Sequence, residues 1–166
     1  MRHRPKINIE LDPIDKAMEM IGIIGLLILI VLPIYFFDKL PDTIPIHYGP
    51  KGKPDGYGGK AMIWTLPLIG IIMYFGMRWL NKFPHTFNYP QKITEDNAIR
   101  LYTFATKMMR TLNVIITCVF ALITYSTVQT ALGNQFGLGT LFTPIFMLLI
   151  FGTIGYFLFK SLEKAE

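Results

Sequence analysis

The sequence predicts an all-α integral membrane protein with four transmembrane helices. Hydrophobic residues make up 52% of the 166 positions and charged residues 16%. No charge occurs in 20–37, 61–77 or 111–159, and the last stretch is interrupted by "GNQFGLGT" at 133–140. Runs of about 18 apolar residues are long enough to cross a hydrocarbon core as helices. We therefore expect one transmembrane domain over 1–166, with spans near 17–37, 61–80, 111–132 and 141–159.

The distribution of Lys and Arg predicts the orientation of these spans. Cytoplasmic loops of membrane proteins carry an excess of both residues. With a cytoplasmic N-terminus, 12 of the 16 fall inside, namely Arg2, Arg4, Lys6, Lys16, Arg78, Lys82, Lys92, Arg100, Lys107, Arg110, Lys160 and Lys164. The outer side holds Lys39, Lys51, Lys53 and Lys60. Both termini are therefore expected in the cytoplasm, the lipid bilayer is the expected partner, and the net charge of +5 indicates no nucleic-acid partner.

The segment "DPIDKAMEM" predicts the start of the first helix. Asp12 is a suitable N-cap, Pro13 suits the first helical position, and Asp15 stands where a capping-box acid would lie. No small-residue cleavage pattern follows the apolar run, so we interpret it as a retained span and not as a signal peptide. In the second span, Trp64 and Trp79 fit aromatic belts at the two membrane surfaces, and Arg78 is close enough to the inner end to reach the headgroups.

An amphipathic inner helix is predicted over 94–110, before the third span. Thr94 is its expected N-cap, and its residues alternate with helical period. Such a helix either lies along the inner membrane surface or extends the third span into the cytoplasm. The apolar face is Ala98, Leu101, Tyr102, Ala105, Met108 and Leu112, and the polar face is Asp96, Arg100, Thr103, Lys107 and Arg110.

The third span becomes polar toward its outer end, at "TYSTVQT" over 124–130. Its hydroxyls either bond to the backbone and neighbouring helices, or Thr124, Thr127 and Gln129 line an outward-facing pocket beneath the first loop. The centre of each span lacks ionisable residues, which is evidence against a self-contained pump. Cys118, the only cysteine, is expected to be a small buried packing residue.

The outer loop, 38–60, is far longer than a tight connection needs, and loops of this length are usually functional or disordered. Its composition indicates order. "TIPIHY" alternates as a short extended segment does, and "KPDGYGG" is typical of a turn in which Pro54 sets φ and Asp55 bonds the backbone. We expect a proline-braced cap over the helix ends.

The polar side chains of this loop could hold a metal ion or could have a structural role. His47 with Asp38, Asp42 and Asp55 is a weak zinc signal, because His3 and His85 fall on the opposite side of the membrane. We therefore predict no catalytic residue, no metal and no cofactor, with His47 and Asp55 forming hydrogen bonds inside the loop. The loop residues expected to bind a ligand or to structure the loop are His47, Tyr48, Pro54, Asp55, Tyr57 and Lys60.

The loop also carries a family pattern, LPxxIPxH followed by GxPDxYG and Lys. It is matched at Leu40, Pro41, Ile44, Pro45, His47, Tyr48, Gly52, Pro54, Asp55, Tyr57, Gly58 and Lys60, with departures at Gly49 and Gly59, where asparagine and serine are usual. The first two spans and this loop resemble the domain of unknown function that precedes the core of the SdpI-like (sporulation-delay immunity) membrane family.

The resemblance implies a role in toxin immunity, envelope sensing or signalling, at a prokaryotic plasma membrane. The partners it implies are a secreted peptide toxin or a membrane-associated regulatory protein. The alternative function is a small transporter or channel subunit with an outward-facing pocket, and either protein could form a homo-oligomer.

Overall fold

The computed structural model describes residues 4–163 and contains four long helices and one strand hairpin. Four of its helical segments are long and apolar enough to cross a membrane. The elements in chain order are α1 (Pro13–Phe36), β1 (Thr43–Tyr48), β2 (Pro54–Gly59), α2 (Thr65–Leu80), α3 (Glu95–Ala131) and α4 (Phe142–Leu162), with 3₁₀ turns at Phe37–Lys39, Lys60–Trp64 and Pro84–Thr86. Arg2, His3 and Lys164, which are expected on the cytoplasmic side, are not among the described residues.

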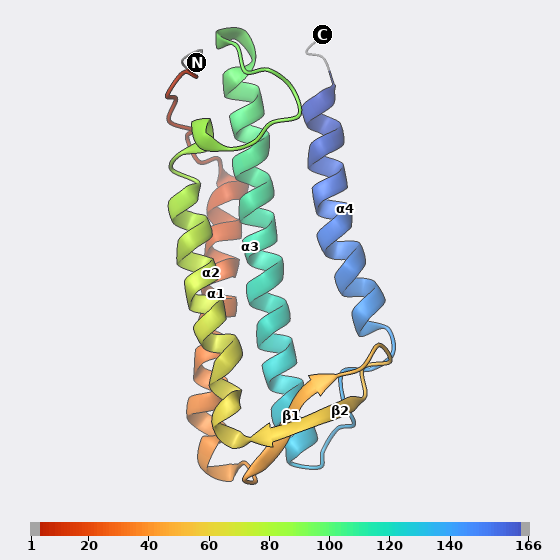
Figure 1. Ribbon diagram of the computed structural model, residues 1–166. Coiled ribbons are helices and arrows are strands. Elements are labelled where there is room, and N and C mark those ends of the chain that lie inside the picture. The colour runs from red at the N-terminus through yellow and green to blue at the C-terminus, as the bar shows by residue number, and fades with distance from the viewer. Residues whose placement is uncertain (1–3, 164–166) are drawn as a thin grey trace.

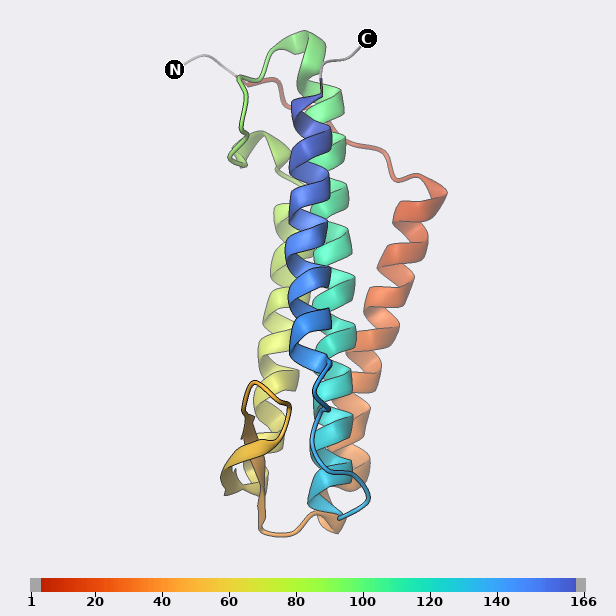
Figure 2. The ribbon, with the colours of Figure 1, turned by 90° about the vertical axis from the view of Figure 1, so that its right-hand side faces the viewer.

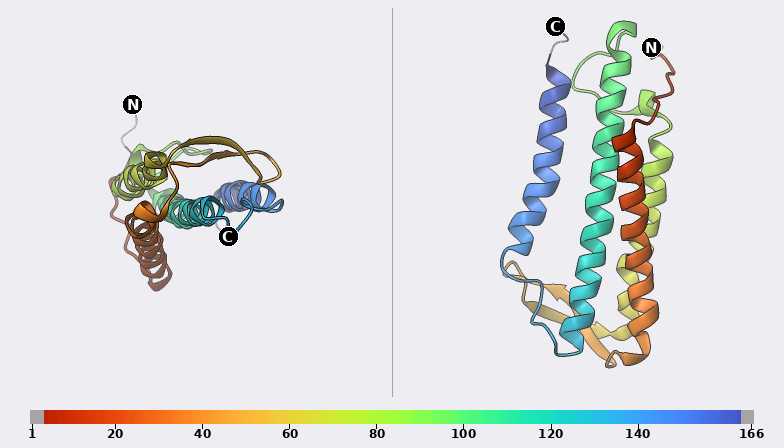
Figure 3. Two further views of the ribbon diagram at one scale, coloured as in Figure 1. Left: turned by 90° about the horizontal axis from the view of Figure 1, so that it is seen from below. Right: turned by 180° about the vertical axis from the view of Figure 1, so that it is seen from behind.

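The helices run alongside one another, and α3 is the central one. Seen along the bundle, α3 lies between α4 on one side and α1 with α2 on the other (Figure 3). Both ends of the described chain and the α2–α3 connector lie at one end of the bundle, called here the terminal end (Figure 1). The hairpin and the α3–α4 loop lie at the opposite end, the hairpin end (Figure 2).

The inner amphipathic helix does not exist as a separate element. Residues 95–131 form one continuous helix, which corrects the predicted boundary near residue 111. At 1.5 Å per residue this helix is roughly 55 Å long, well beyond a hydrocarbon core of about 30 Å. Of the two arrangements left open by the sequence, α3 adopts the one in which the amphipathic segment extends the span. That segment packs against the start of α1, through pairs such as Lys107 with Asp12.

The first helix starts as its sequence predicts and then packs closely on α3. Asp12 Oδ1 accepts from the Asp15 amide at 2.8 Å, and Asp15 Oδ2 accepts from the Asp12 amide at 3.2 Å, which completes a capping box. Further along, a Cβ on Gly25 would lie 3.1 Å from Thr117 Oγ1. Small residues let transmembrane helices approach closely. The adjoining core consists of Leu26, Leu29, Tyr74 and Ala121.

The outer loop is an antiparallel hairpin, so the all-α expectation is wrong in this part of the chain. The extended "TIPIHY" segment is confirmed as β1. The "KPDGYGG" segment is not the turn, because 54–59 form β2 and the turn lies at 49–53. The glycines of β2 let the two strands approach closely: a Cβ on Gly56 would lie 2.9 Å from His47 Cβ, and one on Gly58 would lie 2.9 Å from Ile46 Cδ1.

A second small core fixes the base of the hairpin on the bundle. Ile44 in β1 and Val128 in α3 are fully buried, and Leu40 and Ile63 are nearly so. Burying such side chains contributes roughly 1.5–3 kcal/mol each in apolar transfer free energy where water is excluded. The hairpin is therefore an ordered cap at the hairpin end, as the composition of the loop indicated.

Cys118 is exposed on the surface of the bundle, which corrects the expectation that it is buried. This matters for a test of orientation, which should use a Cys118→Ser background. In that background we expect Lys51→Cys, in the hairpin turn, to react with a membrane-impermeant thiol reagent applied to intact cells. Lys92→Cys, in the connector at the terminal end, should react after the cells are opened. Labelling of Lys92→Cys alone in intact cells would reverse the predicted orientation.

Candidate functional site

A groove with a volume of about 340 Å³ lies between the hairpin and the helices at the hairpin end. Four segments far apart in the sequence form it: β1, the beginning of α2, the last turns of α3 and the beginning of α4. Pockets of this size are typical of small-ligand sites, which are mostly apolar with a few polar groups. The apolar walls include Ile44, Ile46, Ile63, Leu66, Ile123 and Phe142, and the polar groups are His47, Tyr48, Thr65, Thr124 and Thr127.

Two hydroxyls of α3 differ sharply in their hydrogen bonding within this groove. Thr127 Oγ1 bonds to Tyr48 Oη at 2.9 Å, which joins β1 to α3. Thr124, one turn deeper, is 1% exposed, and its Oγ1 has no hydrogen-bond partner within residues 4–163. A buried hydroxyl without a partner costs about 1–3 kcal/mol relative to a paired one. An unpaired, buried hydroxyl therefore belongs to a residue that borders the groove.

His47 and Asp55 bond to each other across the hairpin, as expected. His47 Nδ1 lies 2.5 Å from Asp55 Oδ1, and both side chains are at least half exposed. Asp42 instead pairs with Lys60 at 3.4 Å, at the base of the hairpin. Within residues 4–163, no group of three or more His, Cys, Asp or Glu side chains is placed to hold a metal ion. His47 borders the groove, with its ring tied to β2.

The remaining predicted residues lie elsewhere. Pro54 and Tyr57 line a second, more open hollow between β2 and the α3–α4 loop. Gln129 Oε1 accepts from Asn134 Nδ2 at 3.0 Å, so it fastens that loop. The groove thus brings together His47, Tyr48, Thr124 and Thr127. The sequence does not predict the apolar walls from α2 and α4, because their residue types are the same as those of lipid-facing positions.

The tip of the hairpin is seated on the α3–α4 loop. Gly52 O accepts from the Leu138 amide at 2.8 Å. Gly52, Gly137 and Gly139 all have positive φ, at 68°, 77° and 83°. A Cβ on Gly52 would lie 2.2 Å from Gly139 O. Only glycine fits both the left-handed backbone and this close approach. The contact joins the hairpin tip to the loop that leads into α4.

A cluster of ion pairs joins three helices near the terminal end, and the sequence analysis did not foresee it. Asp12, Asp15 and Glu19 recur along one face of α1 at the helical spacing, i, i+3 and i+7. Lys107 Nζ lies 2.5 Å from Asp12 Oδ2, and Arg110 Nη1 lies 3.3 Å from Asp15 Oδ1. The Lys107 hydrogen bond holds the pKa of the Asp12 carboxyl below its ordinary value. Opposite charges at matched spacing therefore set the register of α1 against α3.

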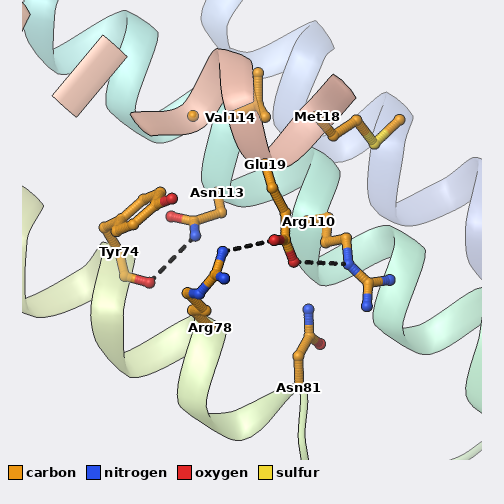
Figure 4. Close-up of a pocket in the computed structure, with 9 residues that line it drawn as sticks. Met18, Glu19, Tyr74, Arg78, Asn81, Arg110, Asn113 and Val114 are labelled. Atoms are coloured by element: carbon orange, nitrogen blue, oxygen red, sulfur yellow. Dashed lines mark hydrogen bonds and ion pairs between the residues drawn. The ribbon is translucent and has the colours of Figure 1, made fainter. Parts of the chain in front are cut away.

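The rest of the cluster surrounds a small cavity between α1, α2 and α3 (Figure 4). Arg78 Nη1 bonds to Glu19 Oε2 at 2.6 Å, and Arg110 Nε lies 3.6 Å from Glu19 Oε1. The Arg78 side chain is 49% exposed while it makes this pair, so the expectation that it reaches the headgroups stays a prediction. Arg110, placed by the sequence on a solvated basic face, is 7% exposed. The spacing of the acids in α1 was the signal that could have found both pairs.

Replacing Tyr48 with phenylalanine should weaken the attachment of the hairpin to α3. Loss of the Thr127 bond is expected to lower the free energy of unfolding by about 1 kcal/mol. Burial raises the pKa of the Tyr48 phenol, so the stabilisation by the neutral phenol is complete below about pH 10 and is lost as the pH rises through the folded-state pKa. In a pH titration followed by tyrosinate absorbance, the difference between wild type and Tyr48→Phe should show a phenol that ionises at a higher pH than an ordinary tyrosine.

Tyr57→Phe is the matched control for this substitution. The Tyr57 side chain is 61% exposed, and its hydroxyl makes no hydrogen bond within the described chain. Its removal should leave the unfolding free energy unchanged. An equal loss in both variants would contradict a specific Tyr48–Thr127 bond.

Four apolar helices and a strand hairpin over their ends place the chain in the class of multi-pass membrane proteins. A family model described as "Domain of unknown function (DUF1648)" matches residues 24–71, which cover the second half of α1, the hairpin and the first half of α2. The chain is 28% identical over 95 residues to an uncharacterized protein of Archaeoglobus fulgidus, a match that covers 51% of this chain and 52% of the relative. The chain thus spans about half the length of this relative. No solved structure shows a significant match.

Proposed function

We propose that this protein binds an apolar peptide segment in the groove beneath the hairpin, on the extracytoplasmic side of the membrane. The observation that carries the proposal is the buried hydroxyl of Thr124, a residue of this mostly apolar groove, which has no partner among the described residues. Such binding serves toxin immunity, by sequestering a membrane-active peptide, or envelope sensing. The resemblance of the loop pattern to the sporulation-delay immunity family supports this reading.

The chemistry of the groove favours a peptide over a lipid chain. Ile46, Ile63 and Phe142 offer apolar contact that either occupant would accept. An acyl chain, however, has no group that can pair with the Thr124 hydroxyl, and the buried group would remain unsatisfied. A peptide supplies apolar side chains together with backbone amide and carbonyl groups. A peptide would therefore pack against the apolar walls and form a hydrogen bond with the Thr124 hydroxyl.

The position of the groove also supports a signalling role. Its walls come from the hairpin, from α2 and from the first turn of α4 at Phe142. A bound peptide would therefore contact the hairpin, α2 and α4 together, and these three elements otherwise contact one another mainly through α3. α4 packs chiefly on α3, and the described residues of α4 are largely exposed. A ligand that displaces the beginning of α4 would thereby alter the surface available to a membrane-associated regulatory partner at the terminal end.

The test uses fluorescently labelled, membrane-active peptides as probes. Binding to the detergent-solubilised full chain is followed by anisotropy, and survival of a sensitive host expressing the protein is measured with the same peptides. Thr124→Val keeps the shape of the side chain and removes the hydroxyl, and should weaken binding about fivefold, as expected for one hydrogen bond of about 1 kcal/mol. Thr103→Val, on the same helix at the terminal end, is the control and should bind as wild type does.

Two outcomes would contradict the proposal. If the wild type and Thr124→Val bind the peptide with equal affinity, the Thr124 hydroxyl does not take part in recognition. Unchanged survival of the host with and without the protein would remove the immunity role. Solute flux into liposomes containing the protein, above that into empty liposomes and reduced in Thr124→Val, would instead favour the small transporter or channel subunit.

A further inference from the structure

A second groove, called here the terminal groove, lies at the terminal end between the α2–α3 connector, α3 and the last turns of α4. The connector runs across α3 toward α4 (Figure 1), and its volume with these helices encloses about 380 Å³. Leu80 is 40% exposed and Leu158 is 43% exposed, so the walls reach the outer surface of the bundle, where an apolar chain can enter from the side. The apolar walls include Leu80, Phe104, Met108, Met109, Phe157 and Leu158.

Arg100 lies at the rim of the terminal groove. It precedes Phe104 by four residues, so the two side chains share one face of α3. Arg100 Nη1 donates to Lys160 O at 3.4 Å, and Lys160 is next to Ser161, which lines the groove. The Arg100 side chain therefore reaches from α3 to the last turn of α4, where the groove ends.

The charge of Arg100 has no counter-charge in the described chain. Among the partly or fully buried Lys and Arg side chains of residues 4–163, it is the one that forms no ion pair with a carboxylate. Glu95 and Asp96, which precede it on α3, are exposed, and Glu163 pairs with Lys160 at 2.9 Å. Burying a charge is costly unless it is paired. A half-buried cation beside an apolar groove therefore favours an occupant that brings a negative charge.

The rim of the terminal groove is expected at the level of the lipid headgroups. α4 has 21 residues, a length of about 31 Å that is close to a hydrocarbon core of about 30 Å. Lys160, near its end, is then at the membrane surface, and the apolar walls lie just inside it. The connector over 81–93 adds Lys82 and Lys92 and contains no Asp or Glu. Basic pockets between membrane helices bind the headgroups of anionic lipids.

We propose that the terminal groove binds an anionic phospholipid, with its phosphate on the Arg100 guanidinium and one acyl chain along Phe104, Met108 and Phe157. A guanidinium has five N–H donors, and Arg100 uses one of them within the described chain. Arginine and phosphate pair through two parallel hydrogen bonds, which gives both strength and orientation. A phosphatidylcholine brings the same chains but adds a positive choline group, so it is the weaker ligand. This site is separate from the peptide groove at the hairpin end.

Native mass spectrometry of the delipidated, unaltered chain in detergent tests the proposal. Palmitoyl-oleoyl phosphatidylglycerol should bind one per chain and about tenfold more tightly than the phosphatidylcholine with the same acyl chains. Glycerol phosphate, which has the charge without the chains, should not bind. Phosphatidylglycerol with a diazirine in one acyl chain should cross-link within 104–109 and 157–161.

Four outcomes with the unaltered chain would overturn the proposal. They are equal affinity for the two lipids, binding of glycerol phosphate alone, cross-links spread evenly along α1, and a dimer that takes up no lipid. The last of these would assign the groove to a second copy of the chain. None of them depends on a variant folding.

A pair of variants with the same change of charge locates the headgroup. Arg100→Gln keeps a donor for Lys160 O and removes the charge, and it should bring the affinity for phosphatidylglycerol close to that for phosphatidylcholine. Lys16→Gln, at an exposed position of α1 at the same end, is the control and should keep the wild-type preference. An equal loss of preference in both variants would show that general surface charge attracts the lipid, and would contradict the proposed site.

Discussion

Replacing Arg110 with methionine is expected to lower the free energy of unfolding by about 3–5 kcal/mol, because it leaves a buried carboxylate without its counter-charge. The Asp15 side chain is 1% exposed and that of Arg110 is 8% exposed, so neither is well solvated when the other is removed. Methionine fills much of the vacated volume, and the loss therefore reports the missing charge. Thermal and SDS-induced unfolding of the purified chain measure it.

Two further variants separate the charge effect from general damage. Asp15→Asn/Arg110→Met removes both charges while keeping an oxygen for the Asp12 amide, and it should recover most of the loss, since a neutral replacement of a buried pair is often tolerated. Lys107→Met breaks the neighbouring, partly exposed pair with Asp12 and should have a much smaller effect. If Lys107→Met and Arg110→Met lower the unfolding free energy equally, burial of the Arg110–Asp15 pair does not explain the loss in Arg110→Met.

Replacing Gly52 with alanine is expected to detach the tip of the hairpin from the α3–α4 loop. An L-residue in the left-handed region costs about 1–2 kcal/mol, and the new Cβ would collide with Gly139 O. Relief of that collision breaks the Leu138–Gly52 bond, which adds about 1 kcal/mol. Hydrogen exchange at the Leu138 amide and proteolysis within 133–140 should both accelerate markedly.

Two glycines of the same region serve as controls. A Cβ on Gly133 meets open space although its φ is 77°, so Gly133→Ala isolates the backbone strain. Gly59 has neither a positive φ nor a close neighbour, and Gly59→Ala should change the unfolding free energy by less than about 0.5 kcal/mol. If Gly52→Ala behaves like Gly133→Ala, the tip is not seated against Gly139.

The sequence identified the membrane helices well, because length and apolar composition are local properties of a span. It misplaced the start of the third helix, since no proline or glycine separates Ala98 from Thr111 and helical periodicity alone cannot distinguish a surface helix from an extended span. The sequence also predicts a turn where the structure has β2. "KPDGYGG" has the residues of a turn, and its strand conformation depends on how closely β1 packs beside Gly56 and Gly58.

The candidate site was predictable only where polar residues marked it. Thr124 and Thr127 stand out as polar residues in an apolar span and Tyr48 belongs to the loop pattern, and the structure brings the three together in one groove. Ile63 and Phe142 did not stand out, because a groove wall and a lipid-facing surface use the same residues. The ion pairs were missed because Asp15 had already been explained by capping and Arg110 by a solvated face. Helix capping accounts for Asp15 and a solvated face accounts for Arg110 without any other helix. The pair between them depends on how α1 packs against α3, which local sequence patterns do not encode.

The seating of Gly52 on the α3–α4 loop has a consequence for synthesis of the chain. The hairpin tip contacts residues 137–139, so at least 85 residues (137 minus 52) must be added after Gly52 before its partner exists. At about 5–20 residues per second, this takes roughly 4–17 s of translation. During that interval the hairpin tip lacks the loop on which it is seated. The groove is thus completed late, after α3 has been inserted and the chain has turned toward α4.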